Sequence, residues 1–196
     1  MKRLVATSIA ALLASTVSYA GSFDGPYVSV GAGAQYTGNT NFGGTASADI
    51  SDTHFVGQIL AGYSFEIAPK FSLATNAFFN LSNDKAGSSS SITATTKNNI
   101  GISIEPGYYL DDKTLAYVKV GYARIDSKLD DGAVKTNDSL NGYLFGAGAK
   151  YLIDKNIYVG AEFTHYGYGS NSAQLSSVTS YKTEQNVGLV TLGYQF

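Results

Sequence analysis

The sequence predicts an all-β fold, an eight-stranded antiparallel up-and-down transmembrane β-barrel. Segments of about ten residues alternate between apolar and polar side chains, which matches the side-chain period of two in a membrane-spanning strand. Eight such segments occur, and the connections between them alternate strictly between long and short. The last segment, Thr183–Phe196, has an apolar face that ends in two aromatic residues. Together these observations favour a sheet that closes on its final strand.

The first twenty residues have the form of a secretory signal peptide. Lys2 and Arg3 precede an apolar run, and Ser18-Tyr19-Ala20 places small residues at the third and first positions before Gly21. The apolar run is shorter than the ~20 residues that a spanning helix needs. We expect residues 1–20 to be cleaved and residues 21–196 to form one outer-membrane barrel domain.

Charge and cysteine content exclude several classes of function. Removing Lys2 and Arg3 from the thirteen basic residues leaves eleven against fifteen acidic ones, a net charge of −4. This balance argues against a nucleic-acid partner. The chain has no Cys, so it offers no disulfide framework and no thiolate metal site. No cofactor is predicted.

The first four predicted strands each place branched or aromatic residues on one parity and small or polar residues on the other. Pro106 lies within the fourth, where it removes one donor from the ladder. In chain order, these strands are Tyr27–Tyr36, with Val28, Val30 and Ala34 on the apolar face; about His54–Phe65, with Phe55, Ile59 and Tyr63; Phe71–Ser82, with Leu73, Ala77 and Phe79; and Asn99–Leu110, with Ile100, Ile102 and Ile104.

The last four predicted strands repeat the pattern. They are Thr114–Ile125, with Ala116, Val118 and Val120 on the apolar face; Asn141–Leu152, with Tyr143, Phe145 and Tyr151; about Ile157–Tyr166, with Val159, Ala161 and Phe163; and Thr183–Phe196, with Val190, Leu192 and Tyr194. Four polar segments rich in Gly, Ser, Thr and Asn are predicted to be long loops. These segments are Thr37–Asp52, Asn83–Lys97, Asp126–Ser139 and Gly167–Lys182.

Charged residues indicate which face meets lipid. Glu105, Lys119, Lys150 and Glu162 all fall on the parity opposite to the apolar, aromatic-ended one. A soluble, lipocalin-like barrel would place the apolar parity inside, around a ligand. We therefore expect the charged parity to face a polar lumen and the apolar parity to face lipid.

The chain resembles the small outer-membrane barrels of Gram-negative bacteria, the OmpA/OmpX-type and opacity-protein-like surface antigens. The resemblance rests on GPYVSVGAGAQY (Gly25–Tyr36), EPGYYLDDKTLAYVKVGYA (Glu105–Ala123), LFGAGAKY (Leu144–Tyr151) and LGYQF (Leu192–Phe196). It implies an outer-membrane location with both termini periplasmic. It also implies recognition of Leu192, Tyr194 and Phe196 by the barrel-assembly machinery. The periplasmic peptidoglycan-binding domain of the long OmpA proteins is not expected.

The four inward charges are predicted to form a lumen charge network. A tight turn at Asp111–Lys113 brings Glu105 opposite Lys119, while Lys150 and Glu162 fall at a comparable height on the next two strands. An eight-stranded lumen is just wide enough for side chains, and charges inside it must be paired or hydrated. We interpret the network as a structural plug, with a gated proton or ion path as the alternative.

Three further candidate sites lie outside the lumen. Arg124, outward near the outer rim, is predicted to contact lipopolysaccharide phosphates. The aspartates of the third loop lack the ligand spacing of a calcium site and are interpreted as a solvated turn. Eight-stranded lipid A deacylases use His and Ser two residues apart; His165 is followed at that distance by Gly167, so no catalytic residue is assigned.

The predicted function is that of a non-enzymatic, structural and surface-exposed barrel, adhesive through its four long extracellular loops. Its partners would be outer-membrane lipids and lipopolysaccharide, the assembly machinery, and a host or surface ligand bound by the loops. A narrow channel for small solutes is the alternative, and a lipid-modifying enzyme the weaker one.

Overall fold

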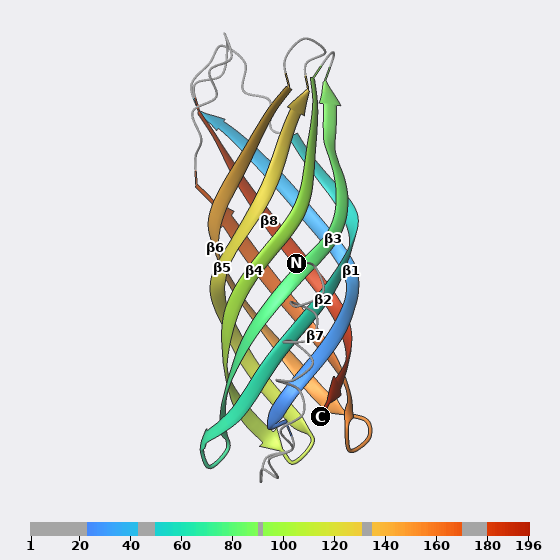
Figure 1. Cartoon of the computed structure of the whole chain (residues 1–196), viewed down its shortest axis with the longest axis vertical. Coiled ribbons are helices and arrows are strands. Elements are labelled where there is room, and N and C mark those ends of the chain that lie inside the picture. The colour runs from blue at the N-terminus through green and yellow to red at the C-terminus, as the bar shows by residue number, and fades with distance from the viewer. Residues whose placement is uncertain (1–22, 43–49, 90–91, 131–134, 170–179) are drawn as a thin grey trace, which may run out of the picture.

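The computed structural model is a closed antiparallel barrel of eight strands in sequence order, in which β8 pairs with β1 (Figure 1). The structure describes residues 23–42, 50–89, 92–130, 135–169 and 180–196, so the predicted signal peptide lies outside it. The predicted fold class is confirmed. The strands are β1 (Gly25–Phe42), β2 (Ile50–Ala68), β3 (Phe71–Ser89), β4 (Ile92–Asp111), β5 (Thr114–Asp130), β6 (Lys135–Leu152), β7 (Ile157–Tyr168) and β8 (Ser180–Gln195).

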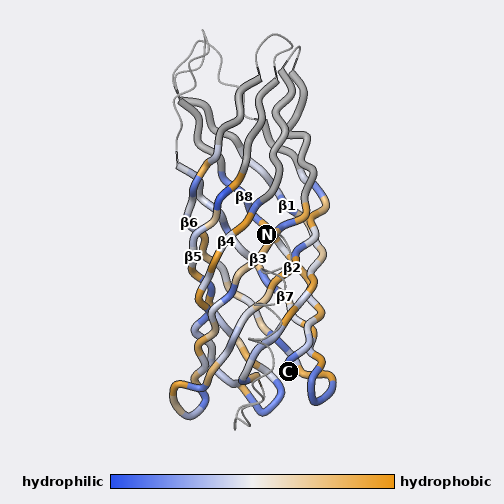
Figure 2. The backbone as a smooth tube through the Cα atoms, in the orientation of Figure 1, coloured by the Kyte–Doolittle hydropathy of each residue, from blue (hydrophilic) through white to orange (hydrophobic). Residues whose placement is uncertain are grey.

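Side chains alternate between the lumen and the outside along each strand, as the period of two predicts. On β4, Ile102 and Ile104 are exposed, whereas Ser103 and Glu105 between them are buried. Hydrophobic and hydrophilic stretches accordingly succeed one another along the barrel wall (Figure 2). Pro106 remains in the ladder opposite Leu73 of β3. In the described part of the chain, no helix is long and apolar enough to cross a membrane.

One end of the barrel, here called the turn end, holds the short connections together with the start of β1 and the end of β8 (Figure 1). Lys70 takes a positive φ of 68° between β2 and β3, which reverses the chain in two residues. Asp111 accepts hydrogen bonds from the Lys113 backbone N–H and the Thr114 hydroxyl between β4 and β5. These bonds hold the pKa of the Asp111 carboxyl below its ordinary value.

The opposite end, here called the hairpin end, differs from the sequence-based prediction. Three of the polar segments predicted as long loops, Thr37–Asp52, Asn83–Lys97 and Asp126–Ser139, consist largely of strand, and within them residues 43–49, 90–91 and 131–134 lie outside the described chain. Most of the fourth, Gly167–Lys182, lies outside the described residues. β4 has 20 residues, whereas a membrane-spanning strand needs about 9–11. Where the strands extend past the membrane, neither of their faces has to be apolar. The alternation of apolar and polar residues therefore disappears there, although the strands remain paired. Bulges at Asn80/Asn83 and Lys97/Ile100 mark this change.

The sheet divides at the hairpin end within the described residues. The β2–β3 ladder ends at Gly57–Leu81, and the β6–β7 ladder ends at Gly142–Tyr168. Past these pairs β3, β4, β5 and β6 remain paired with one another as far as Ser89–Ile92 and Asp130–Lys135. A four-stranded extension, β3 to β6, therefore stands beyond the closed barrel.

The lumen is less polar than predicted. Large apolar side chains fill it beside the polar ones, among them Leu60, Phe78, Leu144, Leu189 and Tyr166, all at most 6% exposed. Because an eight-stranded barrel encloses no free channel, its interior is packed like a core. The inward parity thus combines charge with apolar packing, where the sequence pattern indicated a mainly polar lumen.

Candidate functional site

The four charges predicted for the lumen lie together in the structure. Lys119 Nζ is 2.8 Å from Glu162 Oε1 and 3.5 Å from Glu105 Oε1, and Lys150 Nζ is 2.9 Å from Glu105 Oε2. The flanking pairs Ile104–Val120 and Gly107–Tyr117 set the register that places Glu105 level with Lys119. Two carboxylates and two ammonium groups alternate in one chain of contacts, so the cluster is neutral as a whole.

Hydroxyl and amide groups complete this lumen charge network. The Tyr117 hydroxyl donates to Glu162 Oε2 at 2.8 Å, and the Thr164 hydroxyl donates to Glu162 Oε1 at 3.0 Å. Lys150 Nζ donates to the Tyr27 hydroxyl at 3.3 Å, and that hydroxyl donates to Asn76 Oδ1. Carboxylates and ammonium groups removed from water need such partners. The sequence reasoning assigned no role to these tyrosines, although their inward parity placed them in the lumen.

Aromatic rings surround Lys150. Its Nζ lies 4.5 Å from the ring centroid of Tyr27, 4.7 Å from that of Tyr117 and 5.8 Å from that of Tyr158. A cation over an aromatic face is attracted by the ring quadrupole, most strongly where water is excluded. Lys150 is thus held by one carboxylate and three rings, whereas Lys119 is held by two carboxylates.

Glycines on neighbouring strands make room for these rings. Tyr158 on β7 lies opposite Gly193 on β8, and Tyr117 on β5 lies opposite Gly148 on β6. A Cβ added at Gly193 would lie 2.0 Å from Tyr158 Cζ, and one at Gly148 would lie 2.6 Å from Tyr117 Cζ. The inward glycines therefore position the tyrosines that hold Lys150 and Glu162.

Apolar side chains bound the network on both sides. Along β7 the inward residues run from Tyr158 at the turn end through Glu162 to Tyr166 and Tyr168 toward the hairpin end. At the turn end Phe23, ahead of β1, packs against Tyr158 with ring centroids 5.9 Å apart. On the other side Phe78 contacts Tyr166 at 6.3 Å and lies 5.4 Å from Lys119 Nζ. The charged layer is thus enclosed between two aromatic layers.

The sequence as a whole matches a known family. Residues 4–196 fit the family model described as outer membrane protein beta-barrel domain. The chain belongs to this family. The protein is accordingly an outer-membrane β-barrel, and its exposed apolar band faces lipid. A comparison with curated protein sequences gives no significant match.

Solved structures of small outer-membrane barrels have the same fold. The chain is similar to Ail, the attachment invasion locus protein of Yersinia pestis, with 13% identity, a TM-score of 0.57, and coverage of 88% of this chain and 99% of that one. It is also similar to neisserial surface protein A, with 16% identity, a TM-score of 0.59, and coverage of 88% and 98%. At this identity the likeness establishes the fold alone.

The residues predicted to act on the outside of this outer-membrane barrel lie on its lipid-facing parity. Arg124 is exposed on β5, and its Nη2 donates to the Ser139 hydroxyl at 2.7 Å. Leu192, Tyr194 and Phe196 are 44–51% exposed, and the last two rings pack edge to face at 5.0 Å. Phe196 also donates its backbone N–H to the Pro26 carbonyl, which fixes the end of the chain beside β1.

Two weaker candidates can also be placed in this barrel. His165 Nδ1 lies 2.8 Å from Asn186 Oδ1, and the His165 ring packs on Phe145 with centroids 4.9 Å apart. Among the loop aspartates, Asp126 and Asp130 lie on β5 and Asp138 on β6, while Asp131 falls outside the described residues. Within the described chain, no three His, Asp or Glu side chains gather into a possible metal site.

Proposed function

We propose that this protein is a non-enzymatic surface barrel, a closed membrane anchor that presents its hairpin end outside the cell for binding to a partner. The observation that supports this most strongly is the lumen charge network, whose charges are mutually paired and enclosed by aromatic layers. A lumen filled in this way acts as structure, which leaves the two ends of the barrel for contact with other molecules.

A channel for small solutes is the second candidate considered. Conduction needs sites that an ion can enter and leave, but both carboxylates are already paired with Lys119 and Lys150. Ions would also have to pass Phe23 on one side and Phe78 with Tyr166 on the other. These groups favour a closed barrel.

A lipid-modifying enzyme receives less support. His165 has the outward position that such chemistry needs, but its ring nitrogen faces the Asn186 amide and its ring packs on Phe145. An imidazole activates a nucleophile only when a hydroxyl or thiol lies within hydrogen-bond reach. A lipid A deacylase would have serine two residues after this histidine, but Gly167 occupies that position. Ser170, the nearest later serine, lies outside the described residues.

The extension formed by β3 to β6 is the proposed binding surface. Its outer strands, residues 82–89 of β3 and 135–140 of β6, lie past the ends of their ladders with β2 and β7 in the described chain. Such edges accept an extended segment of another protein by strand addition. The extension contains both Lys and Asp, which favours a protein over a polyanion. For comparison, Ail of Yersinia pestis has been solved in complex with the heparin analogue sucrose octasulfate.

The proposal includes an orientation and two membrane contacts. The turn end lies in the periplasm and the hairpin end outside, since short turns face the periplasm in bacterial barrels. The aromatic end of β8, with Tyr194 and Phe196, is read by the assembly machinery before insertion. Arg124, toward the hairpin end of β5, contacts lipopolysaccharide phosphates in the outer leaflet.

Shortening the extension tests this function. We would replace residues 84–96 by a two-residue Asn-Gly turn and, in a second variant, residues 128–137 by the same turn, because both hairpins belong to the extension and neither change removes a lumen charge. Both variants should keep the heat-modifiable migration of a folded barrel on unboiled gels but lose binding of the expressing cells to host cells or matrix. As a matched control, the 153–156 turn at the other end is replaced. Binding that survives both shortened variants would contradict the proposal.

A further inference from the structure

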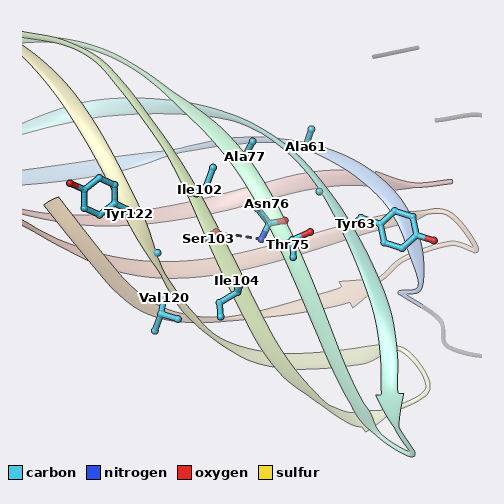
Figure 3. Close-up of a pocket in the computed structure, with 12 residues that line it drawn as sticks. Ala61, Tyr63, Thr75, Asn76, Ala77, Ile102, Ser103, Ile104, Val120 and Tyr122 are labelled. Atoms are coloured by element: carbon cyan, nitrogen blue, oxygen red, sulfur yellow. Dashed lines mark hydrogen bonds between the residues drawn. The ribbon is translucent and has the colours of Figure 1, made fainter. Parts of the chain in front are cut away.

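A shallow groove crosses the outside of the barrel over β2, β3, β4 and β5 (Figure 3). Its volume is about 740 Å³, within the range of about 300–1,000 Å³ that is typical of ligand pockets. Two cross-strand rows form it, Ala61–Ala77–Ile102–Tyr122 and Tyr63–Thr75–Ile104–Val120. The small side chains of Ala61 and Ala77 create the depression between larger neighbours.

A ridge borders the groove on the side of the hairpin end and ends in a cation. The next outward row in that direction is Ile59–Phe79–Ile100–Arg124, paired residue by residue across the same four strands. Arg124 therefore stands one row beyond Tyr122, where the groove reaches β5. The hydrogen bond from Nη2 to Ser139 holds the guanidinium on the outside of the barrel.

The arrangement matches an amphiphile with an anionic head and a hydrocarbon tail. A guanidinium binds phosphate through charge-assisted hydrogen bonds of fixed geometry. The groove is lined mainly by apolar side chains of the outward face and runs from Tyr122, one row from Arg124, toward Tyr63 near the turn end. A phosphate at Arg124 would thus place an acyl chain of the same molecule at the mouth of the groove.

We propose that this face of the barrel is a seat for one lipopolysaccharide molecule, whose lipid A phosphate binds Arg124 while one of its acyl chains lies in the groove. The inference rests on the proposed orientation, which places Arg124 in the leaflet that contains lipopolysaccharide. It goes further than a phosphate contact, because it assigns the small residues Ala61 and Ala77 to binding as well.

The test compares two variants of the full barrel, purified and placed in phosphatidylcholine nanodiscs. Arg124→Ala removes the phosphate contact and should weaken binding of lipopolysaccharide about tenfold, the expected loss for a hydrogen bond to a charged group. Ala77→Phe fills the groove and should weaken binding to a comparable extent. Ala161→Phe, the same change on the outward face of β7, is the control and should bind as the native protein does. Native mass spectrometry counts the bound lipid.

The outcomes distinguish the phosphate contact from the acyl groove. They also distinguish lipopolysaccharide from a phospholipid as the source of the phosphate. Loss with Arg124→Ala but not with Ala77→Phe would overturn the acyl groove, and unchanged binding in both variants would overturn the seat. Equal binding of phosphatidylglycerol would overturn the assignment to lipid A. The measurement requires no partner protein, so its failure is distinguishable from failure of the proposed surface function, which the shortened variants test.

Discussion

The two faces of each strand meet different demands, and β4 illustrates the contrast. Glu105, on the lumen side, has two lysines within 3.5 Å, and both come from other strands. Ile104, its neighbour in sequence, is 46% exposed to the lipid side. Lipid tails are as apolar as the side chain itself and accept many shapes. We infer that the lumen face specifies the structure residue by residue, while the outer face needs only to be apolar, except where it holds a particular lipid.

Breaking the lumen charge network should have the largest effect. Glu162→Gln leaves two lysines to share Glu105, with Lys119 3.5 Å from that carboxylate. Removing one partner of a buried ion pair lowers the free energy of unfolding by about 3–5 kcal/mol. Urea unfolding of the refolded barrel in lipid vesicles, followed by tryptic protection or gel mobility, measures the loss.

The paired variant shows whether charge is the cause. Lys119→Met combined with Glu162→Gln leaves Glu105 and Lys150 as a neutral pair. The double variant should therefore be more stable than Glu162→Gln alone. The stability losses of Lys119→Met and Glu162→Gln are also measured separately. If their sum equals the loss in the double variant, Lys119 and Glu162 are not coupled.

Adding a methyl group on either face should give the next largest contrast. Gly193→Ala brings a Cβ within 2.0 Å of Tyr158 Cζ, so the ring must leave its position 5.8 Å from Lys150 Nζ. Overpacking of this kind costs about 1–3 kcal/mol of stability. Gly188, five residues earlier on the outward face of β8, has no atom within 4 Å of an added Cβ. Gly188→Ala should leave the urea midpoint unchanged or raised, and an equal loss at both positions would contradict the account.

A conservative change on the lipid face should have a small effect. Ile102 is 65% exposed on β4, and lipid replaces the methylene that Ile102→Val removes. We expect the free energy of unfolding to change by less than about 0.5 kcal/mol, as at most surface positions. Urea titration beside the native barrel checks this, and a loss above 1.5 kcal/mol, the upper end of the ~0.5–1.5 kcal/mol for a buried Ile→Val, would mean that the outer face is packed like a core.

Substitution of Asp111 at the turn end should have the smallest effect on stability, and this effect should depend on pH. Its pKa lies below the ordinary value because the Lys113 N–H and Thr114 hydroxyl donate to the carboxylate. A depressed carboxyl pKa stabilises the fold above the unfolded value of about 4, and the stabilisation is lost as pH falls through the folded value. Asp111→Asn should therefore lower the urea midpoint slightly at pH 7, and the difference from the native barrel should shrink as the pH falls below about 4. A difference that does not change with pH would assign the effect to something other than ionisation.

The sequence predicts most of the barrel, and the failures have physical causes. Strand starts and ends at the turn end are correct to within three residues, because Pro69, Asp111 and Asn156 favour reversals there. The hairpin end was predicted as loop because the alternation vanishes where neither face meets lipid. Strand pairing there follows from the neighbouring strands, which a single segment does not reveal.

The candidate site was predictable in part for a similar reason. Charges are costly on the lipid face except near its rim, where Arg124 lies. Glu105, Lys119, Lys150 and Glu162 could therefore be assigned to the lumen from parity alone. Tyrosine is common on both faces, as outward Tyr108 and inward Tyr109 show. Residue type therefore did not identify the three tyrosine rings around Lys150. Phe23 precedes the first alternating segment and has no pattern at all. The groove is formed by rows of residues that pair across four strands. Its prediction requires the register of those strands, which the sequence pattern does not supply.

A conductance measurement tests the closed lumen most directly. The purified, refolded barrel is added to a planar lipid bilayer under a steady voltage in symmetrical salt. Because the lumen charges pair with one another between two aromatic layers, we predict insertion without sustained ion current. Stable open-channel currents that recur with each insertion would contradict the account of a closed barrel whose function lies on its outer surfaces.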